Sequence, residues 1–238
     1  GARQQLRQGA NFIKIMAGGG VASPSDEIST SQYSPEEIEA VVFEAESAGT
    51  YVAAHCYSDR SIINCAKSGV RTIEHGNLMT EAGSAAMKEF GSYLVPTLVT
   101  YETMSRLHKE LALPEFTVRK NIIALENAYD AIATAKNNGV RIGSGSDLLG
   151  PMQIYKGQEL ALQARVLGPM GALVAATKTN AEIIGVESEL GTIEEGKIAD
   201  MVLVISNPLK DLTVLSNYSE NITLILQDGK IYKNILGS

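Results

Sequence analysis

Short apolar runs rich in β-branched residues alternate with longer amphipathic stretches along the chain as far as residue 184. This alternation is typical of repeated βα units, which build a parallel sheet. The pattern predicts strands at 12–17, 51–56, 71–76, 93–98 and 140–147. It predicts helices at 35–49, 59–68, 80–90, 102–111, 115–137, 154–166 and 170–184. Five consecutive βα units are therefore expected.

The pattern changes near Gly191, where the segment GTIEEGKIAD consists of turn-forming and charged residues. Apolar stretches follow at 199–206 and 222–234, and the second contains Asp228-Gly229, a dipeptide typical of tight β-hairpins. The sequence therefore predicts a large α/β domain at 1–190 and a smaller one with antiparallel strands at 191–238.

Five βα units cannot close a (β/α)8 TIM barrel, which needs eight, and an open sheet of buried strands leaves unpaired edges. The first ten residues, GARQQLRQGA, have the pattern of a helix end that leads into a strand. We therefore expect an α/β fold that is the C-terminal part of a TIM barrel, with an N-terminal segment of three further units preceding residue 1.

Composition and charge exclude several classes of function. The chain has a net charge of -7 and no run of Lys or Arg, so a nucleic-acid partner is not expected. No apolar run reaches the roughly 18 residues of a membrane span, and no signal-peptide pattern opens the chain. These features indicate a cytoplasmic protein with a small-molecule substrate, and they leave open whether it forms a homo-oligomer.

Polar residues that can bind metals follow the strand pattern. His55, His75 and Asp147 lie near the ends of three predicted strands, where barrel sites are built, and Lys14 lies between two isoleucines of the first strand. For one such residue alone, an ion pair of the lysine or a hydrogen-bonded core histidine is the simpler interpretation. Together they favour a metal site, because imidazole is a common zinc ligand. A buried, neutral Lys14 could then react with carbon dioxide to form a carbamate that bridges two cations.

Six segments carry a resemblance to a known family: IKIMAGGG, VAAHCY, TIEHGN, VPTL, GSGSD and GTIEEGKIADMVLV. In order and spacing they resemble the metal-dependent amidohydrolase superfamily, in particular its prolidase-like branch, which cleaves Xaa-Pro dipeptides and related N-acyl amino acids. The resemblance covers nearly the whole chain. It implies the C-terminal portion of the barrel, lacking the first barrel strands, followed by part of a small β-sandwich.

The resemblance also implies roles for individual residues. Lys14 would be the carboxylated ligand that bridges two zinc ions, and His55 and His75 would complete the more exposed metal site. Asp147 would bind the other metal and act as general base toward a metal-bridging hydroxide, which hydrolyses the amide bond. Tyr57 matches a family position that holds the α-carboxylate of the substrate, although an ordinary loop tyrosine is nearly as good an interpretation.

The chain departs from the family in one respect, because the His-x-His pair at the end of the first barrel strand is absent. The third histidine, His108, lies in a polar helical context and is expected at the surface or on a lid. Two alternatives follow. The chain is a non-catalytic fragment or half of a split enzyme that requires an N-terminal segment, or it is a cyclic-amide hydrolase such as an imidazolonepropionase-like enzyme.

Overall fold

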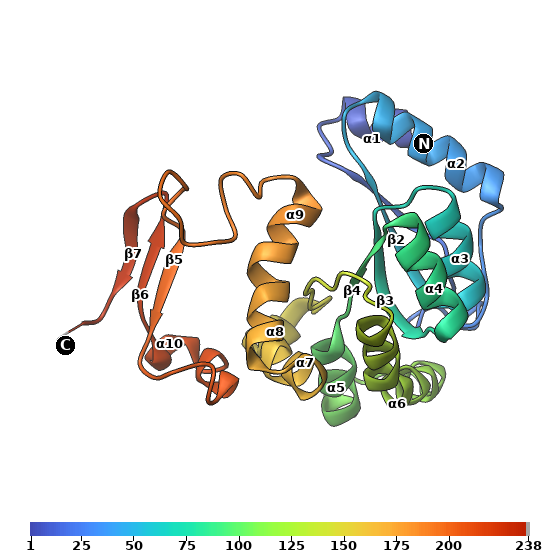
Figure 1. The fold of residues 1–238 in the computed structure, drawn as a ribbon. Helices are drawn as coiled ribbons and strands as arrows, with labels where there is room; N and C mark the ends of the chain where they lie inside the picture. Colours follow the sequence, from blue (N-terminus) through green and yellow to red (C-terminus); the bar gives the residue numbers. More distant parts are fainter. Residues whose placement is uncertain (237–238) are drawn as a thin grey trace. The chain divides into compact units, whose positions relative to one another are not determined.

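A parallel sheet with the strand order β1-β2-β3-β4 lies at the centre of residues 1–142 in the computed structural model, which describes residues 1–236 (Figure 1). The strands are β1 (Ile13–Met16), β2 (Val52–Ser58), β3 (Thr72–Leu78) and β4 (Tyr93–Val95). The helices of this unit are α1 (Ala2–Arg7), α2 (Pro35–Ser47), α3 (Asp59–Lys67), α4 (Glu81–Phe90), α5 (Leu98–Leu107) and α6 (Glu115–Asn137). The predicted alternation of strands and helices is confirmed for these four strands.

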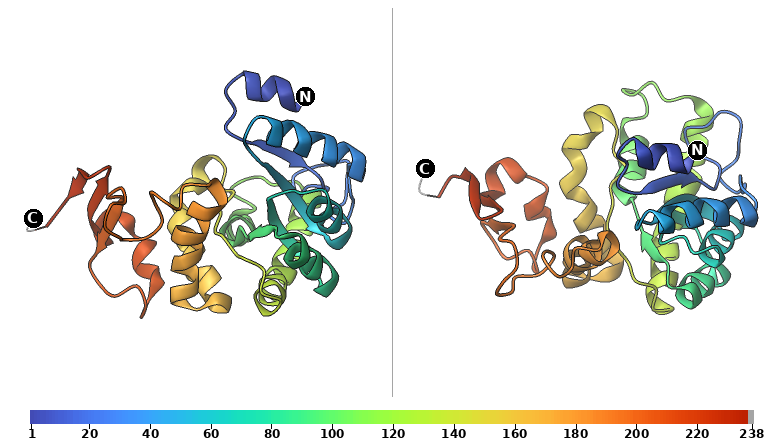
Figure 2. Two further views of the ribbon diagram at one scale, coloured as in Figure 1. Left: turned by 45° about the horizontal axis from the view of Figure 1, so that its top comes forward. Right: turned by 90° about the horizontal axis from the view of Figure 1, so that it is seen from above.

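Helices α2, α3 and α4 lie on one side of this sheet, as both Figure 1 and Figure 2 show. Helix α6 contacts β3 directly, and the Asn77 side-chain amide donates to the Ala124 carbonyl of α6 at 2.9 Å. The predicted start of α2 is confirmed by a capping box. In it, the Glu37 carboxylate accepts from the Ser34 backbone at 2.9 Å and the Ser34 hydroxyl accepts from the Glu37 backbone at 3.4 Å.

The fifth predicted strand, 140–147, is wrong in extent. Only Ile142 pairs with the sheet, through a single parallel bridge to Leu94. The segment that follows, GSGSD, lacks the β-branched and aromatic side chains that pack on a pleated surface, and its glycines disfavour a strand. Within residues 1–236 the four parallel strands therefore form an open sheet and not a closed barrel.

The described residues from 143 to 236 form a second compact unit. Its helical part runs through η1 (Gly150–Gln158), α7 (Glu159–Leu167), α8 (Pro169–Val174), the π-helical η2 (Ala175–Thr179) and α9 (Asn180–Ile184). Its sheet is antiparallel in the order β5-β6-β7, with β5 (Met201–Val204), β6 (Ile222–Gln227) and β7 (Lys230–Asn234); η3 (Leu212–Leu215) and α10 (Tyr218–Asn221) precede β6. The predicted boundary at residue 190 lies within this unit and stays a prediction.

The predicted hairpin is confirmed. Asp228 and Gly229 join β6 to β7 with φ angles of 51° and 71°, the left-handed backbone that a tight hairpin turn requires. Residues 143–236 contain a single sheet, β5-β6-β7, so the expected β-sandwich is not confirmed. No helix in residues 1–236 is long and apolar enough to cross a membrane.

The segment between β1 and α2, which we call the β1–α2 loop (17–34), folds back on the sheet. Gly18 forms an antiparallel bridge with Ser31. Val21 and Ile28 are buried in one apolar cluster with Tyr57, Tyr101 and Ala124. The loop is therefore an integral part of the core of the first unit.

We predict that Gly19→Ala destabilises the chain. A Cβ at this position would lie 2.1 Å from the Glu27 carbonyl oxygen, a backbone atom that can move only with the loop. The expected loss in the free energy of unfolding is about 1–3 kcal/mol by urea denaturation. The control is Gly20→Ala, whose Cβ would lie 3.7 Å from its nearest neighbour and should change the stability by less than about 0.5 kcal/mol. Equal effects would contradict the prediction.

Candidate active site

Two buried imidazoles form the centre of the candidate site. His55 on β2 and His75 on β3 are 6% and 3% exposed, and their ring centroids lie 4.7 Å apart. The structure therefore brings together two of the predicted metal ligands in a space from which water is largely excluded.

The backbone at His75 explains how the two rings meet. The register of β2 and β3 pairs His75 with Cys56, the neighbour of His55, so a regular pleat would direct the two imidazoles to opposite faces. His75 instead has a φ of 73°, in the left-handed region that residues other than glycine seldom adopt. This departure from the pleat accounts for the position of its ring beside His55.

One nitrogen of the His55 ring is fixed by the β1–α2 loop. Its Nε2 lies 3.0 Å from the Gly19 carbonyl oxygen, and a carbonyl can only accept. Nε2 therefore carries the proton, which leaves the lone pair of the neutral ring on Nδ1. A backbone carbonyl bonded to one imidazole nitrogen is a common outer partner of histidines that bind a metal through the other.

The His75 ring is held by Thr97, which precedes α5 and whose hydroxyl can either donate or accept. Its Nδ1 lies 2.7 Å from the Thr97 hydroxyl, so Nε2 is the nitrogen of this ring that remains for a ligand. Burial, and to a smaller extent the charges of His55 and Lys14, hold the pKa of His75 well below its ordinary value. The ring is therefore neutral near pH 7, which is the form that binds metals.

The prediction that Lys14 is buried is wrong. In β1 the side chains of Ile13 and Ile15 are buried, whereas Lys14 is exposed. Burial alternates along β1, so the face that carries Ile13 and Ile15 is packed and the face that carries Lys14 is not. Lys14 nevertheless pairs with Ala53 in register, on the face that carries His55, and its charge acts on His75. Within residues 1–236 it forms no ion pair, the simpler role considered for it.

Tyr57 lies against both imidazoles. Its ring stacks on His75 at a centroid distance of 5.4 Å and meets the edge of His55 at 4.9 Å. Its hydroxyl is 2.7 Å from that of Tyr101 on α5. Tyr57 is 2% exposed, which makes it a core residue of the site and not an ordinary loop tyrosine.

Thr97 and Tyr101 belong to the site but do not stand out in the sequence. The predicted helix begins at 102, so both residues lie outside it, whereas α5 begins at Leu98 and carries Tyr101 on its buried side. Thr97 is part of the segment VPTL, and its place directly after a buried strand is the one signal in the sequence that could identify it.

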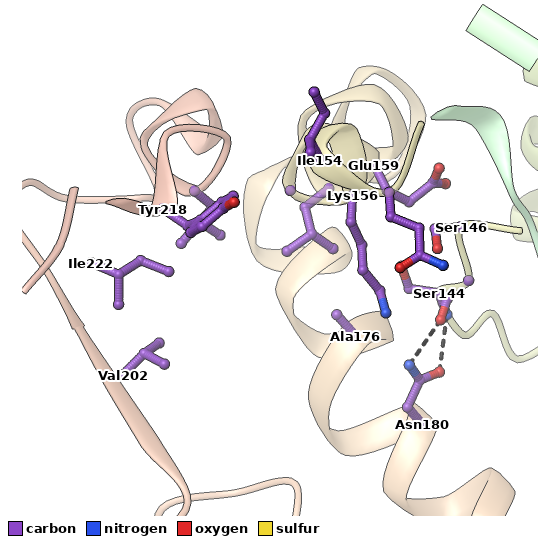
Figure 3. A pocket seen from close by; sticks show the side chains of 15 residues that line it. Ser144, Ser146, Ile154, Lys156, Glu159, Ala176, Asn180, Val202, Tyr218 and Ile222 are labelled. Atoms are coloured by element: carbon purple, nitrogen blue, oxygen red, sulfur yellow. Dashed lines mark hydrogen bonds between the residues drawn. The ribbon is translucent and has the colours of Figure 1, made fainter. Parts of the chain in front are cut away.

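Asp147 belongs to the second unit. It is exposed and has a φ of 47°, again in the left-handed region. The segment before it is fixed by Asn180, whose side chain accepts from the Ser144 backbone at 3.0 Å and donates to the Ser144 carbonyl at 2.9 Å (Figure 3). Ser144 and Asn180 also line a cavity of about 900 Å³ together with Lys156, Glu159, Tyr218 and other residues of this unit. The role of Asp147 as a metal ligand stays a prediction.

The side chains of the first unit fit a metal by the chemistry of their donors. No three His, Cys, Asp or Glu side chains gather into a metal site among residues 1–236, so the two imidazoles need a further ligand. The amine of Lys14 becomes an oxygen ligand only as a carbamate. Two imidazoles, each with one nitrogen bonded to an outer partner, are suitable ligands for zinc-like ions when they are neutral.

His108, which was expected at the surface or on a lid, lies at the C-terminal end of α5. It is half-buried, and its Nδ1 donates to the Ser105 carbonyl at 2.9 Å. This bond caps the end of the helix and gives His108 a local structural role.

Comparison with known proteins identifies relatives over nearly the whole length of the chain. The model of the amidohydrolase family matches residues 1–233. Ochratoxinase from Aspergillus niger is 31% identical over 234 residues, which are 97% of this chain and 48% of that protein. The chain spans about half the length of the curated relatives it matches first.

Two solved structures are similar as well. A prolidase crystallised with N-methylphosphonate-L-proline is 43% identical, with a TM-score of 0.95 over 98% of this chain and 57% of that one. A Xaa-Pro dipeptidase with methionine bound in its active site is 31% identical, with a TM-score of 0.89 over 98% and 57% of the two chains.

We predict that Thr97→Val destabilises the chain because it removes the partner of a buried imidazole nitrogen. The expected loss in the free energy of unfolding is about 1–3 kcal/mol, measured by urea denaturation. The control is Thr103→Val. Thr103 is 1% exposed and its hydroxyl has no hydrogen-bond partner within residues 1–236, so this change should be neutral or stabilising. A Thr97→Val variant with an unchanged free energy of unfolding would show that the bond to His75 contributes nothing to stability.

Proposed function

The chain belongs to the amidohydrolase family, and from this premise we propose that it acts in the hydrolysis of peptide-like amide bonds with the help of divalent metal ions. Xaa-Pro dipeptides or N-acyl amino acids are the proposed substrates. The buried imidazoles of His55 and His75, whose ring centroids lie 4.7 Å apart, are the observation that carries the proposal. The similarity to a prolidase and to a Xaa-Pro dipeptidase supports the choice of substrate.

The proposed ligands are Lys14 as its carbamate, His55, His75 and Asp147. His55 would bind a metal through Nδ1, because its Nε2 is bonded to the Gly19 carbonyl. His75 would bind through Nε2, because its Nδ1 is bonded to the Thr97 hydroxyl. When divalent ions such as zinc are bound, the chemistry they supply is polarisation of the scissile carbonyl and a lower pKa of water. The position of Lys14 on the face of β1 that carries His55 supports its place beside the two imidazoles.

Asp147 is the proposed general base. Its carboxylate takes a proton from the attacking water and delivers it to the leaving amide nitrogen, which must be protonated to depart as an amine. The left-handed backbone at Asp147 supports this role, because strained backbone positions cluster at catalytic sites.

Tyr57 is the proposed binding group for the α-carboxylate of the substrate. Its hydroxyl lies 2.7 Å from the Tyr101 hydroxyl. If Tyr101 donates in that bond, the Tyr57 proton is directed to another acceptor, and a carboxylate is the strongest acceptor a dipeptide offers. A cyclic amide has no such group at the reacting end, so Tyr57 favours the dipeptide.

The proposal extends to the fold. The open parallel sheet of the first unit is proposed to be part of a (β/α)8 barrel, and the sheet of the second unit part of a small β-sandwich. The four-strand parallel sheet and the family membership support this.

We predict that the chain binds Zn²⁺ through the imidazoles and Lys14. His55→Ala and His75→Ala should each weaken Zn²⁺ affinity by more than about tenfold, measured by competition with a chromophoric chelator. Lys14→Met should remove a carbamate resonance that ¹³C-bicarbonate introduces into the carbon NMR spectrum. Lys109→Met, a change of an exposed lysine, serves as the control and should leave both signals unchanged. Histidine variants that bind Zn²⁺ like the unaltered chain would contradict the proposal.

We predict that Tyr57→Phe raises KM for Xaa-Pro dipeptides by about tenfold to a hundredfold, because a hydrogen bond to a charged group is lost. KM for the corresponding dipeptide amides, which lack the carboxylate, should stay the same. Tyr232→Phe, at an exposed position of β7, is the control. If Tyr57→Phe and the unaltered chain have the same KM for the Xaa-Pro dipeptide acid, Tyr57 does not bind the carboxylate of the substrate. Zn²⁺ binding without turnover of any amide would favour the non-catalytic alternative.

A further inference from the structure

Lys120 on α6 is a buried cation. It is 1% exposed, and its ammonium group lies within the β1–α2 loop. There it donates to the Gly20 carbonyl at 3.3 Å, to the Ser23 carbonyl at 2.6 Å and to the Asp26 carbonyl. The three donors of the ammonium group thus meet three backbone acceptors of one loop.

The same loop is held by side chains on either side of Lys120. The Asp26 carboxylate accepts from the Ser23 and Ser25 hydroxyls at 2.6 and 3.0 Å and from the Gln32 amide at 2.7 Å. Arg119, next to Lys120, forms an exposed ion pair with Glu27 at 2.6 Å. The inner part of the loop is fixed by the buried ammonium, since an exposed ion pair contributes little.

The loop in turn fixes the His55 ring. Gly20, whose carbonyl Lys120 binds, directly follows Gly19, whose carbonyl accepts the proton of His55 Nε2 at 3.0 Å. The Gly19 backbone has little room to move by itself, because even a Cβ there would meet the Glu27 carbonyl oxygen at 2.1 Å. The position of the Gly19 carbonyl therefore depends on the β1–α2 loop, whose backbone carbonyls Lys120 binds.

We infer that Lys120 is a positioning residue of the candidate site: by holding the β1–α2 loop it places the Gly19 carbonyl and so sets the tautomer of His55. The inference rests on the proposed function insofar as His55 is a metal ligand. A ring with its proton on Nε2 presents the Nδ1 lone pair, and the wrong tautomer blocks that nitrogen with a proton. Lys120 thus acts on metal binding without touching a metal.

The test combines NMR with Zn²⁺ titration of the full chain. Long-range ¹H–¹⁵N spectra at a pH of about 8, where neutral imidazole prevails, report which ring nitrogen carries the proton. His75→Gln and His108→Gln variants assign the signals. We expect protonated Nε2 for His55 in the unaltered chain. In Lys120→Met we expect a mixture of both His55 tautomers. We also expect a Zn²⁺ affinity about tenfold weaker, because residues that orient a metal ligand through hydrogen bonds typically have effects of this size.

Arg119→Met is the matched control, because it removes a neighbouring contact of the same helix with the same loop. It should leave the tautomer and the Zn²⁺ affinity unchanged. Lys120→Gln is the second variant if Lys120→Met does not fold, as judged by circular dichroism, because its amide still satisfies part of the loop. It should shift the tautomer in the same direction.

Folded Lys120 variants with the His55 tautomer of the unaltered chain would overturn the inference. So would an equal shift in Arg119→Met, since the effect would then belong to any disturbance of the loop. A tautomer shift in chains that bind no Zn²⁺ would support the positioning by Lys120 and at the same time overturn the metal site proposed above.

Discussion

The burial of two imidazoles side by side is the constraint on which the candidate site depends. Polar groups removed from water destabilise a fold unless they are hydrogen-bonded, and each ring has one fixed partner, the Gly19 carbonyl for His55 and the Thr97 hydroxyl for His75. Burial and the neighbouring charges keep His75 neutral. Burial of the two rings therefore destabilises the fold, but it also favours neutral imidazole, the form with a lone pair that a metal ion can bind.

The geometry of the site comes from irregular backbone and not from the regular sheet. The φ of 73° at His75 turns a residue out of the pleat, and close contact at Gly19 places a carbonyl beside His55. Lys120 then holds the loop that carries this carbonyl. Strain and buried charge at these positions are typical of functional sites, where rigidity of a few groups matters more than local stability.

Hydrophobic periodicity and turn chemistry are sufficient to predict four parallel strands, the start of α2 at Pro35 and the hairpin at Asp228-Gly229, because these features depend on residues close in sequence. The exposure of Lys14 could not be predicted in this way, since it depends on which face of an edge strand is packed. The contacts of Thr97, Tyr101 and Lys120 join residues 22 to 100 positions apart, and no local pattern encodes them.

The central claim is that the two imidazoles hold a metal ion, and anomalous diffraction tests it most directly. Crystals of the chain grown with Zn²⁺ would be measured on both sides of the zinc absorption edge. The account predicts an anomalous peak in contact with Nδ1 of His55 and Nε2 of His75. Imidazoles that keep their hydrogen bonds to Gly19 and Thr97 with no anomalous peak at either nitrogen, at saturating Zn²⁺, would contradict it.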